Sequence, residues 1–205
     1  MTAVNPPRSE AELEELLSRP TPSLAPRLEE VPGDILILGA GGKMGPSLAR
    51  MAKRALPGRR IMAVSRWSDE HAAASLRASG VETLHCDLLD RRALDALPHA
   101  PNVVFMAGQK FGTTGNPAGT WAMNAAVPAF VADRFAGVRT VVFSTGNVYP
   151  LTPVERGGSR EDDAPDPIGE YAYSCLARER IFTAASARHG TPVSIVRLNY
   201  AHDLR

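Results

Sequence analysis

Short, unbroken apolar runs alternate along the chain with longer stretches in which apolar residues recur every three or four positions. The runs are typical of strands buried on both faces of a parallel sheet, and the stretches between them predict amphipathic helices. Six strands are predicted in this way, at residues 35–38, 61–64, 82–86, 103–106, 140–143 and 193–198. This alternation predicts an α/β fold, a Rossmann-type doubly wound parallel sheet with the strand order 3-2-1-4-5-6.

Polar residues and prolines indicate where the helices begin and end. Ser68 is the expected cap of an alanine-rich helix over 69–79, and a long helix over 169–189 should end at Gly190. Asn116 predicts the start of a helix that extends to residue 135 and that Pro128 must bend or divide. The apolar residues of that helix that we expect to face the core are Trp121, Ala125 and Phe130.

The first 33 residues are expected to form a segment separate from this domain. Ser9 and Glu12 have the spacing of a capping box, which predicts a short helix from about Ser9 to Ser18. Prolines make residues 19–33 an irregular connector. The helix could be a solvated arm or a packing or dimer contact. The sequence therefore divides into residues 1–33 and one Rossmann-type domain over residues 34–205.

The strongest functional signal is a glycine-rich turn between the first strand and the helix after it. Gly39, Gly42 and Gly45 recur at every third position, with Lys43 and Met44 inside the turn. This geometry directs free backbone N–H groups and the positive end of a helix toward a phosphate. A Cβ atom would block the tight turn or the approach of a pyrophosphate. We therefore expect a dinucleotide to bind here.

The end of the second strand bears on which dinucleotide binds. In a dinucleotide-binding fold this strand end faces the adenosine ribose, where an acidic residue selects the 2′-OH and an arginine accommodates a 2′-phosphate. Ser65 and Arg66 stand here in place of the acidic residue, which favours NADP over NAD. Arg66 as an ordinary surface cation is the alternative.

Composition and charge exclude several other classes of protein. The 23 lysines and arginines nearly balance the 22 aspartates and glutamates, so no overall field attracts nucleic acid or an anionic membrane. No apolar run approaches the roughly 20 residues that a membrane span needs. The two cysteines form no evident disulfide framework, and the histidines have no spacing for a metal site. We expect a cytoplasmic protein without a metal.

The motifs, taken in order over about residues 34–200, resemble the extended short-chain dehydrogenase/reductase superfamily. The similar branch is the NAD(P)-dependent epimerase/dehydratase family, which includes UDP-galactose 4-epimerase. The resemblance assigns a catalytic hydroxyl to Thr145 and the catalytic acid/base, which also contacts the cofactor, to Tyr171. The other cofactor positions that it implies are Asp87, Leu88, Ala107, Gly108, Lys110 and Asn124. Judged from the local pattern alone, Asp87 could be a turn residue, and a polar residue such as Asn124 among apolar neighbours usually makes a structural hydrogen bond.

One position departs from the family motif Tyr-x-x-x-Lys. The lysine binds the ribose and keeps the pKa of the tyrosine low, and Cys175 replaces it here. Cysteine supplies no positive charge, and its thiol is expected to be an inert, small apolar filler. Arg178, seven residues after Tyr171 on the same helical face, and Lys110 could each supply part of that charge.

The chain also differs from extended members of the family after its sixth strand. In those members a substrate-binding lobe is built there, whereas almost nothing comes after residue 198, so we expect the lobe to be absent or truncated. The resemblance implies hydride transfer at a secondary alcohol or ketone, plausibly of a sugar or nucleotide sugar, by a possible homodimer. The alternative is a catalytically silent NAD(P)-binding or sensor protein that has lost the lysine.

Overall fold

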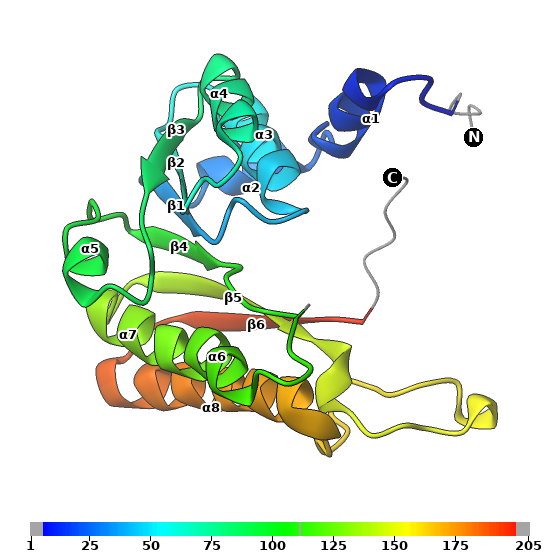
Figure 1. Cartoon of the computed structure of the whole chain (residues 1–205). Helices are drawn as coiled ribbons and strands as arrows, with labels where there is room; N and C mark the ends of the chain where they lie inside the picture. The colour runs from blue at the N-terminus through cyan, green and yellow to red at the C-terminus, as the bar shows by residue number, and fades with distance from the viewer. Residues whose placement is uncertain (1–5, 111, 200–205) are drawn as a thin grey trace. The chain divides into compact units, whose positions relative to one another are not determined.

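The computed structural model describes residues 6–110 and 112–199 of the chain (Figure 1). Its strands form one six-stranded sheet in the order β3-β2-β1-β4-β5-β6, which confirms the predicted Rossmann-type topology. Strand pairs β1/β2, β2/β3, β4/β5 and β5/β6 are parallel. The strands are β1 (Ile35–Leu38), β2 (Ile61–Ser65), β3 (Glu82–His85), β4 (Asn102–Phe105), β5 (Arg139–Thr145) and β6 (Val193–Leu198).

The chain divides into two compact units, and the described part of the first comprises residues 6–85. Every residue of β1 is buried, as expected for a strand covered on both faces. Helix α3 (Gly45–Ala55) packs on β2, and α4 (Glu70–Ala78) packs on β3 and against α3. The glycine turn between β1 and α3 is thus anchored by two packed elements.

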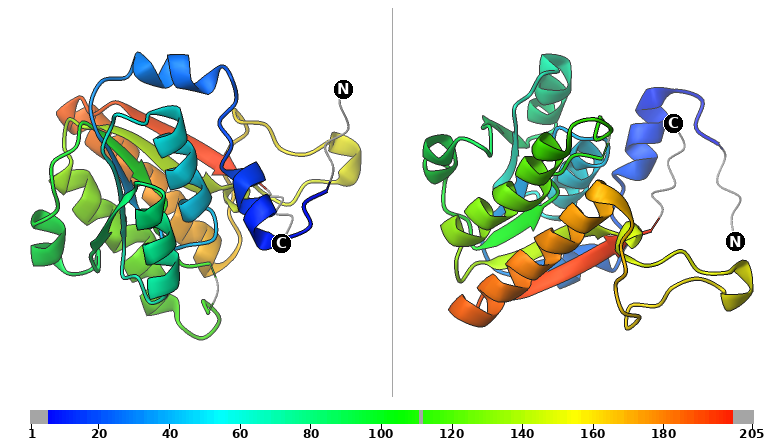
Figure 2. Two further views of the ribbon diagram at one scale, coloured as in Figure 1. Left: turned by 90° about the horizontal axis from the view of Figure 1, so that it is seen from above. Right: turned by 60° about the horizontal axis from the view of Figure 1, so that its bottom comes forward.

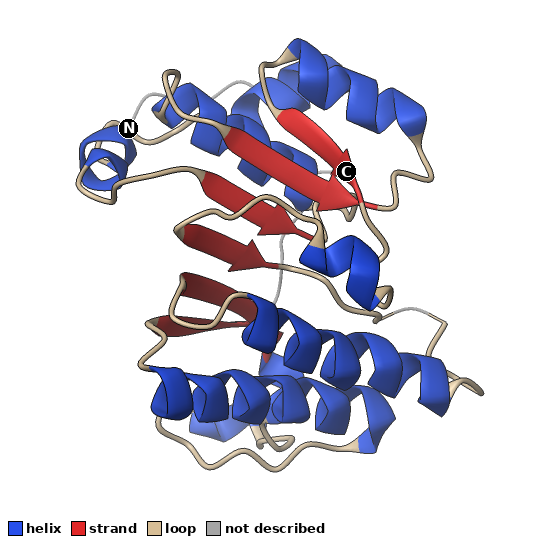
Figure 3. Cartoon of the chain, turned by 90° about the vertical axis from the view of Figure 1, so that its left-hand side faces the viewer, coloured by secondary structure: helices blue, strands red, loops and turns tan. Residues whose placement is uncertain are grey.

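The second unit, residues 86–199 of the described chain, holds α5 (Arg91–Asp95), α6 (Pro117–Trp121), α7 (Val127–Arg134) and α8 (Gly169–His189). Helix α8 packs on β5 and β6, and α6 and α7 lie alongside it (Figure 3). The rings of Phe105 and Phe182 join β4 to α8 in the core, with their centroids 5.2 Å apart. The predicted bounds of α8 and its left-handed end at Gly190 (φ 64°) are confirmed.

Pro128 divides its helix as predicted, and the division takes the form of a π-helical segment. Residues Ala122–Ala126 form this segment between α6 and α7. Proline lacks an N–H and its ring excludes the usual carbonyl partner, so a wider turn before it accommodates the missing bond. The segment holds Asn124, which is fully buried.

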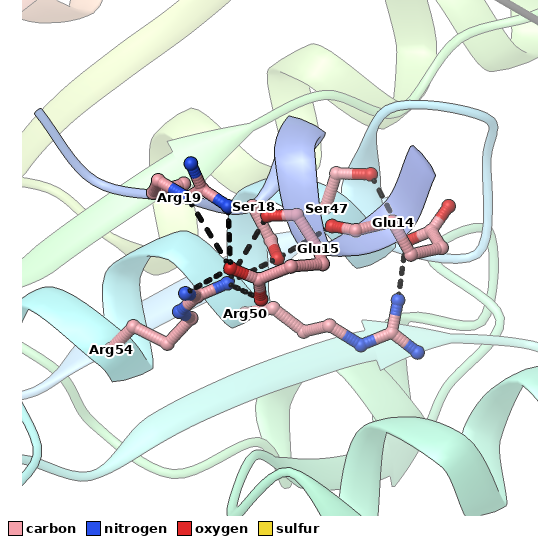
Figure 4. Close-up of polar contacts among 7 residues, drawn as sticks. All are labelled: Glu14, Glu15, Ser18, Arg19, Ser47, Arg50 and Arg54. Atoms are coloured by element: carbon pink, nitrogen blue, oxygen red, sulfur yellow. Dashed lines mark hydrogen bonds and ion pairs between the residues drawn. The ribbon is translucent and has the colours of Figure 1, made fainter. Parts of the chain in front are cut away.

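The N-terminal helix packs on the first unit and is therefore not a solvated arm. Helix α1 (Glu10–Leu17) begins at Ser9, whose hydroxyl accepts a hydrogen bond from the Glu12 amide at 3.2 Å. Its Leu13 is buried. Two glutamates of α1 form ion pairs with arginines of α3 (Figure 4): Glu14 with Arg50 at 2.5 Å and Glu15 with Arg54 at 2.6 Å.

Three local predictions were wrong. The connector over 19–33 contains a short helix, α2 (Leu24–Glu29). Pro26 does not prevent this helix, because it lies in the first turn, where a backbone N–H has no helical partner in any case. Helix α4 is capped by Asp69 and not by Ser68, since the Asp69 carboxylate accepts from the amides of residues 71 and 72. Trp121 is 38 % exposed and donates to the Glu170 carboxylate.

Residues 151–168 form a long loop that extends away from the second unit's sheet and carries one short 3-10 turn, Val154–Arg156 (Figure 2). Leu151 and Val154 are almost fully exposed in it. None of the described helices has the length and apolar character of a membrane span.

Candidate functional site

The glycine turn of the first unit leaves space where a ligand would need it. Gly39 has a left-handed backbone (φ 87°), and a Cβ on Gly45 would lie 2.2 Å from the carbonyl oxygen of Ala40. These two glycines serve the turn itself. A Cβ on Gly42 would meet only the Gly39 carbonyl oxygen, at 3.7 Å, so the protein's own packing does not require glycine there. The space beside Gly42 is therefore open, and the binding of a pyrophosphate there stays a prediction.

Lys43 and Met44, also predicted at this turn, are exposed at the start of α3. Gly41 is a further constrained position, which the spacing argument missed. A Cβ on Gly41 would lie 2.3 Å from the hydroxyl of Ser65, so β2 and the glycine turn are in direct contact. Ser65 thus lies beside the turn, and its predicted place at the adenosine ribose stays a prediction.

The chain after β2 is held in a fixed conformation. Trp67 has a left-handed backbone (φ 46°), and its indole donates to the carbonyl of Leu84 at 2.9 Å. Arg66 is exposed next to it. The first carboxylate after β2 belongs to Asp69 and is engaged in capping α4. The two side chains at the strand end are therefore a hydroxyl and a guanidinium.

At the start of the second unit, Asp87 is a turn residue, which is the alternative that its local sequence pattern left open. Its carboxylate accepts from the Leu89 amide at 3.0 Å, and its carbonyl accepts from the Asp90 amide. Leu88 is buried beside it. A contact of Asp87 or Leu88 with adenine stays a prediction.

The two residues proposed for catalysis meet in the second unit. Thr145 ends β5 and is buried, and Tyr171 lies half-buried in the first turn of α8. Thr145 lies near enough to Tyr171 to lower the pKa of its phenol, and the Thr145 hydroxyl donates to the Asn147 side-chain oxygen at 3.2 Å. The Thr145 hydroxyl also accepts from the backbone amide of Asn147 at 3.2 Å. A hydroxyl and a phenol side by side can together bind one substrate oxygen.

Burial, together with the neighbouring Cys175, raises the pKa of Tyr171 to about 12. Thr145 and the charge of Arg178 oppose this rise without cancelling it. Cys175 is fully buried, and burial raises the pKa of its thiol, in keeping with an inert filler. Lys110, the predicted lysine of the β4 loop, is exposed.

Asn124 connects the β4 loop to α8. Its side-chain oxygen accepts from the Gln109 amide at 2.8 Å and from Arg178 Nη2 at 2.8 Å. Its amide nitrogen donates to the Gln109 carbonyl at 3.0 Å and to the Ser174 hydroxyl at 3.0 Å. The expected structural hydrogen bond of Asn124 is thus confirmed. Ala107 is buried at the start of the same loop.

The second unit also contains a buried ion pair that the sequence did not predict. Glu179 is 2 % exposed, and Arg197 of β6 donates to its carboxylate from Nη2 at 2.8 Å. The Ser144 hydroxyl donates to the same carboxylate at 2.5 Å. Glu179 lies eight residues after Tyr171 and therefore on the same buried face of α8. An acidic residue among the apolar positions of this helix was the signal in the sequence that could have indicated the pair.

A cavity of about 610 Å³ opens next to Thr145, between the strand ends and the 151–168 loop. Its walls are polar and apolar in about equal parts, and their polar residues include Asn147, Tyr149, Arg160 and Arg197. A cavity with such a mixed lining suits a small organic molecule. In the described part of the chain no group of three or more histidine, cysteine or acidic side chains could hold a metal ion.

The fold and the glycine turn define a dinucleotide-binding α/β protein. A sequence profile of the NAD dependent epimerase/dehydratase family matches residues 35–200, and the chain belongs to this family. Among curated protein sequences, none matches the chain.

Solved structures of nucleotide-sugar enzymes are similar to the chain. They include MoeE5 in complex with UDP-glucose and NAD (26 % identity, TM-score 0.65, covering 81 % of this chain and 53 % of that one). The UDP-Glc/GlcNAc 4-epimerase from Campylobacter jejuni is similar in fold (23 % identity, TM-score 0.69, 80 % and 52 % covered). So is a putative epimerase from Burkholderia cenocepacia (24 % identity, TM-score 0.65, 82 % and 55 % covered). The chain spans about half the length of these proteins.

Proposed function

We propose that the protein is an NAD(P)-dependent epimerase-type oxidoreductase that acts at a secondary alcohol or ketone of a sugar or nucleotide sugar. The observation that carries the proposal is the proximity of Thr145 and Tyr171, which stand at the two motif positions of the family. The substrate class rests on MoeE5, whose structure holds UDP-glucose and NAD. The cavity lined by Asn147, Arg160 and Arg197 next to Thr145 supports it.

In this proposal the glycine turn holds the pyrophosphate, and Lys43, Met44 and the start of α3 border it. A bound nicotinamide dinucleotide supplies the acceptor for the hydride. Thr145 donates a hydrogen bond to the substrate oxygen. The Tyr171 phenolate takes the hydroxyl proton as the hydride leaves the same carbon, and in the reverse direction the phenol returns it. The adenine contacts of Asp87 and Leu88 and the cofactor contacts of Ala107, Gly108, Lys110 and Asn124 are part of the same proposal.

Tyr171→Phe is expected to remove oxidation activity because phenylalanine cannot take the proton. The loss should be on the order of 100-fold or more, as for other positioned acid/base groups. In the unaltered protein the rate of oxidation should rise with pH from neutrality into the alkaline range, since the phenol is protonated at neutral pH and only the phenolate is a base. Steady-state rates with a panel of nucleotide sugars check both expectations.

The matched control is Tyr173→Phe, two residues further on, whose side chain is exposed. It should leave the rate unchanged. Tight binding of the dinucleotide without turnover by the unaltered protein on any substrate of the panel would favour the alternative, a silent binding or sensor protein.

For the cofactor we propose NADP in preference to NAD. Support comes from the end of β2, where the hydroxyl of Ser65 and the guanidinium of Arg66 stand and the nearest carboxylate, that of Asp69, is engaged in a helix cap. A 2′-phosphate would gain a charge-assisted contact with Arg66, whereas a 2′-OH would find no carboxylate to bind.

Arg66→Ala should therefore reduce the affinity for NADP by about 1–3 kcal/mol and leave the affinity for NAD almost unchanged. Calorimetry with both dinucleotides measures the difference. Arg27→Ala removes an exposed arginine from α2 and serves as the control for net charge. Equal affinities of the unaltered protein for NADP and NAD would contradict the preference.

Three further parts of the prediction stay proposals: the cytoplasmic location, the homodimer and the division of the chain at residue 34. Both cysteines are free thiols and buried, which supports the reducing environment of the cytoplasm. The homodimer and the division at residue 34 are tested by the mass of the protein in solution and by deletion of residues 1–33.

A further inference from the structure

Arg178 of α8 places a guanidinium in the interior of the second unit, where it is only 6 % exposed. Its Nη1 donates to the carbonyl of Phe143 at 2.9 Å and its Nη2 to the side-chain oxygen of Asn124 at 2.8 Å. Its Nε is buried and has no hydrogen-bond partner among the described residues. Both hydrogen-bond partners are neutral. Burial of a guanidinium with neutral partners alone is unfavourable, and it lowers the pKa of Arg178.

The β4 loop and the π-helical segment leave room for the Arg178 guanidinium and fix its position. A Cβ on Gly108, in the β4 loop, would lie 2.5 Å from Arg178 Nη2 and 3.1 Å from the Asn124 oxygen. Asn124 is itself fixed by Gln109 and Ser174. Hydrogen bonds to β5 and to the π-helical segment, and the close approach of the β4 loop, therefore hold the guanidinium at one position.

The titratable groups that interact electrostatically with Arg178 all lie on its own helix: Cys175, Tyr171 and Glu179. Its guanidinium carbon also lies 5.7 Å from the centre of the Phe105 ring of β4. Glu179 is already paired with Arg197 of β6 and bonded to Ser144 of β5. Cys175 and Tyr171 are thus the groups whose ionised forms the buried charge of Arg178 can still stabilise.

The other elements that pack on α8 bring few charges. Helix α6, the π-helical segment and the short turn at Gly146–Val148 contain no charged or titratable side chain. The charged residues of α7, β5 and β6 are Asp133, Arg134, Arg139 and Arg197. Arg134 donates to the Leu97 carbonyl, Arg139 to the Asn102 side chain and Arg197 to Glu179. None of these four is among the groups that shift the pKa of Tyr171, which are Thr145 of β5 and Cys175 and Arg178 of α8.

We propose that Arg178 is a positioning residue for the proposed reaction, and that its fixed guanidinium stabilises the Tyr171 phenolate in place of the lysine that the family motif has at position 175. The inference rests on the proposed role of Tyr171. An opposite charge nearby favours the ionised form of a phenol. Residues four and seven positions after Tyr171 share one helical face, so a cation can act on the same phenol from either position. Arg178 offsets only part of the effect of burial, because the pKa of Tyr171 is still raised.

The test is a titration of Tyr171 in the protein without cofactor or substrate. Fluorotyrosine is incorporated, because its phenol ionises at lower pH, and the fluorine resonances are followed as a function of pH. Tyr171→Phe assigns the resonance. Arg178→Gln should give about tenfold less phenolate at a given pH, since a nearby opposite charge shifts a pKa by about 1 or more. Arg178→Lys should retain most of the phenolate.

Arg180→Gln is the matched control, because it removes an exposed arginine from the same helix and should not move the titration. Unchanged titration in Arg178→Gln would overturn the proposal. So would equal titration curves for Arg178→Gln and Arg178→Lys, which would indicate a role in shape alone.

If Arg178→Gln does not fold, Gly108→Ala provides a second test, because the added Cβ displaces the guanidinium without removing its charge. It should also reduce the phenolate fraction, and an unchanged curve would overturn the inference. The titration needs no turnover. A protein that titrates as expected but has no activity would therefore refute the proposed function and leave the electrostatic role intact.

Discussion

Gly42→Val is expected to fold like the unaltered protein and to bind the dinucleotide at least about 100-fold more weakly. Its Cβ has room in the protein, with one contact at 3.7 Å to the Gly39 carbonyl oxygen. The larger side chain would instead occupy the space proposed for the pyrophosphate. Loss of two hydrogen bonds from backbone amides to a charged phosphate accounts for about 3 kcal/mol or more.

Calorimetry gives the affinity, and circular dichroism with thermal unfolding shows whether the fold is kept. Gly58→Val is the control, because a Cβ there meets nothing within 4 Å and Gly58 lies at the opposite end of α3. Gly45→Ala should behave differently and destabilise the protein, since its Cβ would overlap the Ala40 backbone at 2.2 Å. Unchanged dinucleotide affinity in Gly42→Val would show that the pyrophosphate binds elsewhere.

Glu179→Gln should lower the free energy of unfolding by about 3 kcal/mol. The substitution leaves the Arg197 guanidinium without its carboxylate, and breaking a buried pair costs about 3–5 kcal/mol. The lower end of this range applies because the Arg197 side chain is 20 % exposed. The hydrogen bond from Ser144 is weakened by the same change, since a neutral amide oxygen is a poorer acceptor than a carboxylate.

Urea unfolding followed by circular dichroism measures this effect. Glu82→Gln breaks the pair with Arg60, whose two side chains are 38 % and 45 % exposed, and should change the stability by less than about 1 kcal/mol. If the two variants lose the same stability, the interior pair does not support the second unit.

Much of the fold can be predicted from periodicity, because strands buried on both faces leave continuous apolar runs. Strands β1 and β6 and helix α8 have the predicted bounds, and the sheet order agrees with the alternation of strands and helices. The errors lie where neighbouring residues compete for one local role. Ser68 and Asp69 are both suitable caps, and only the path of the chain after the left-handed Trp67 decides between them.

The site could be predicted in part for a similar reason. The glycine turn and the positions of Thr145 and Tyr171 are local patterns, so the sequence contains them. The contact of Gly41 with Ser65 and the pair of Glu179 with Arg197 join residues far apart in the chain, and spacing along one element does not indicate them. The seven-residue spacing indicated that Arg178 shares a face with Tyr171, but its three-sided support needed the structure.

The close approach of Gly108 to Arg178 restricts the order in which related sequences could have changed. Since any Cβ at residue 108 would lie 2.5 Å from Arg178 Nη2, a larger residue there would displace the guanidinium from its place beside Asn124. Glycine at 108 is therefore expected to come before arginine, with the lysine of the family motif lost only afterwards if its charge was needed throughout. Reversal to alanine at 108 should cost more while arginine is present, because only the contact of 3.1 Å with the Asn124 oxygen remains once the arginine is gone. Reconstructed ancestors of this branch should then carry glycine at 108 before they carry cysteine at 175.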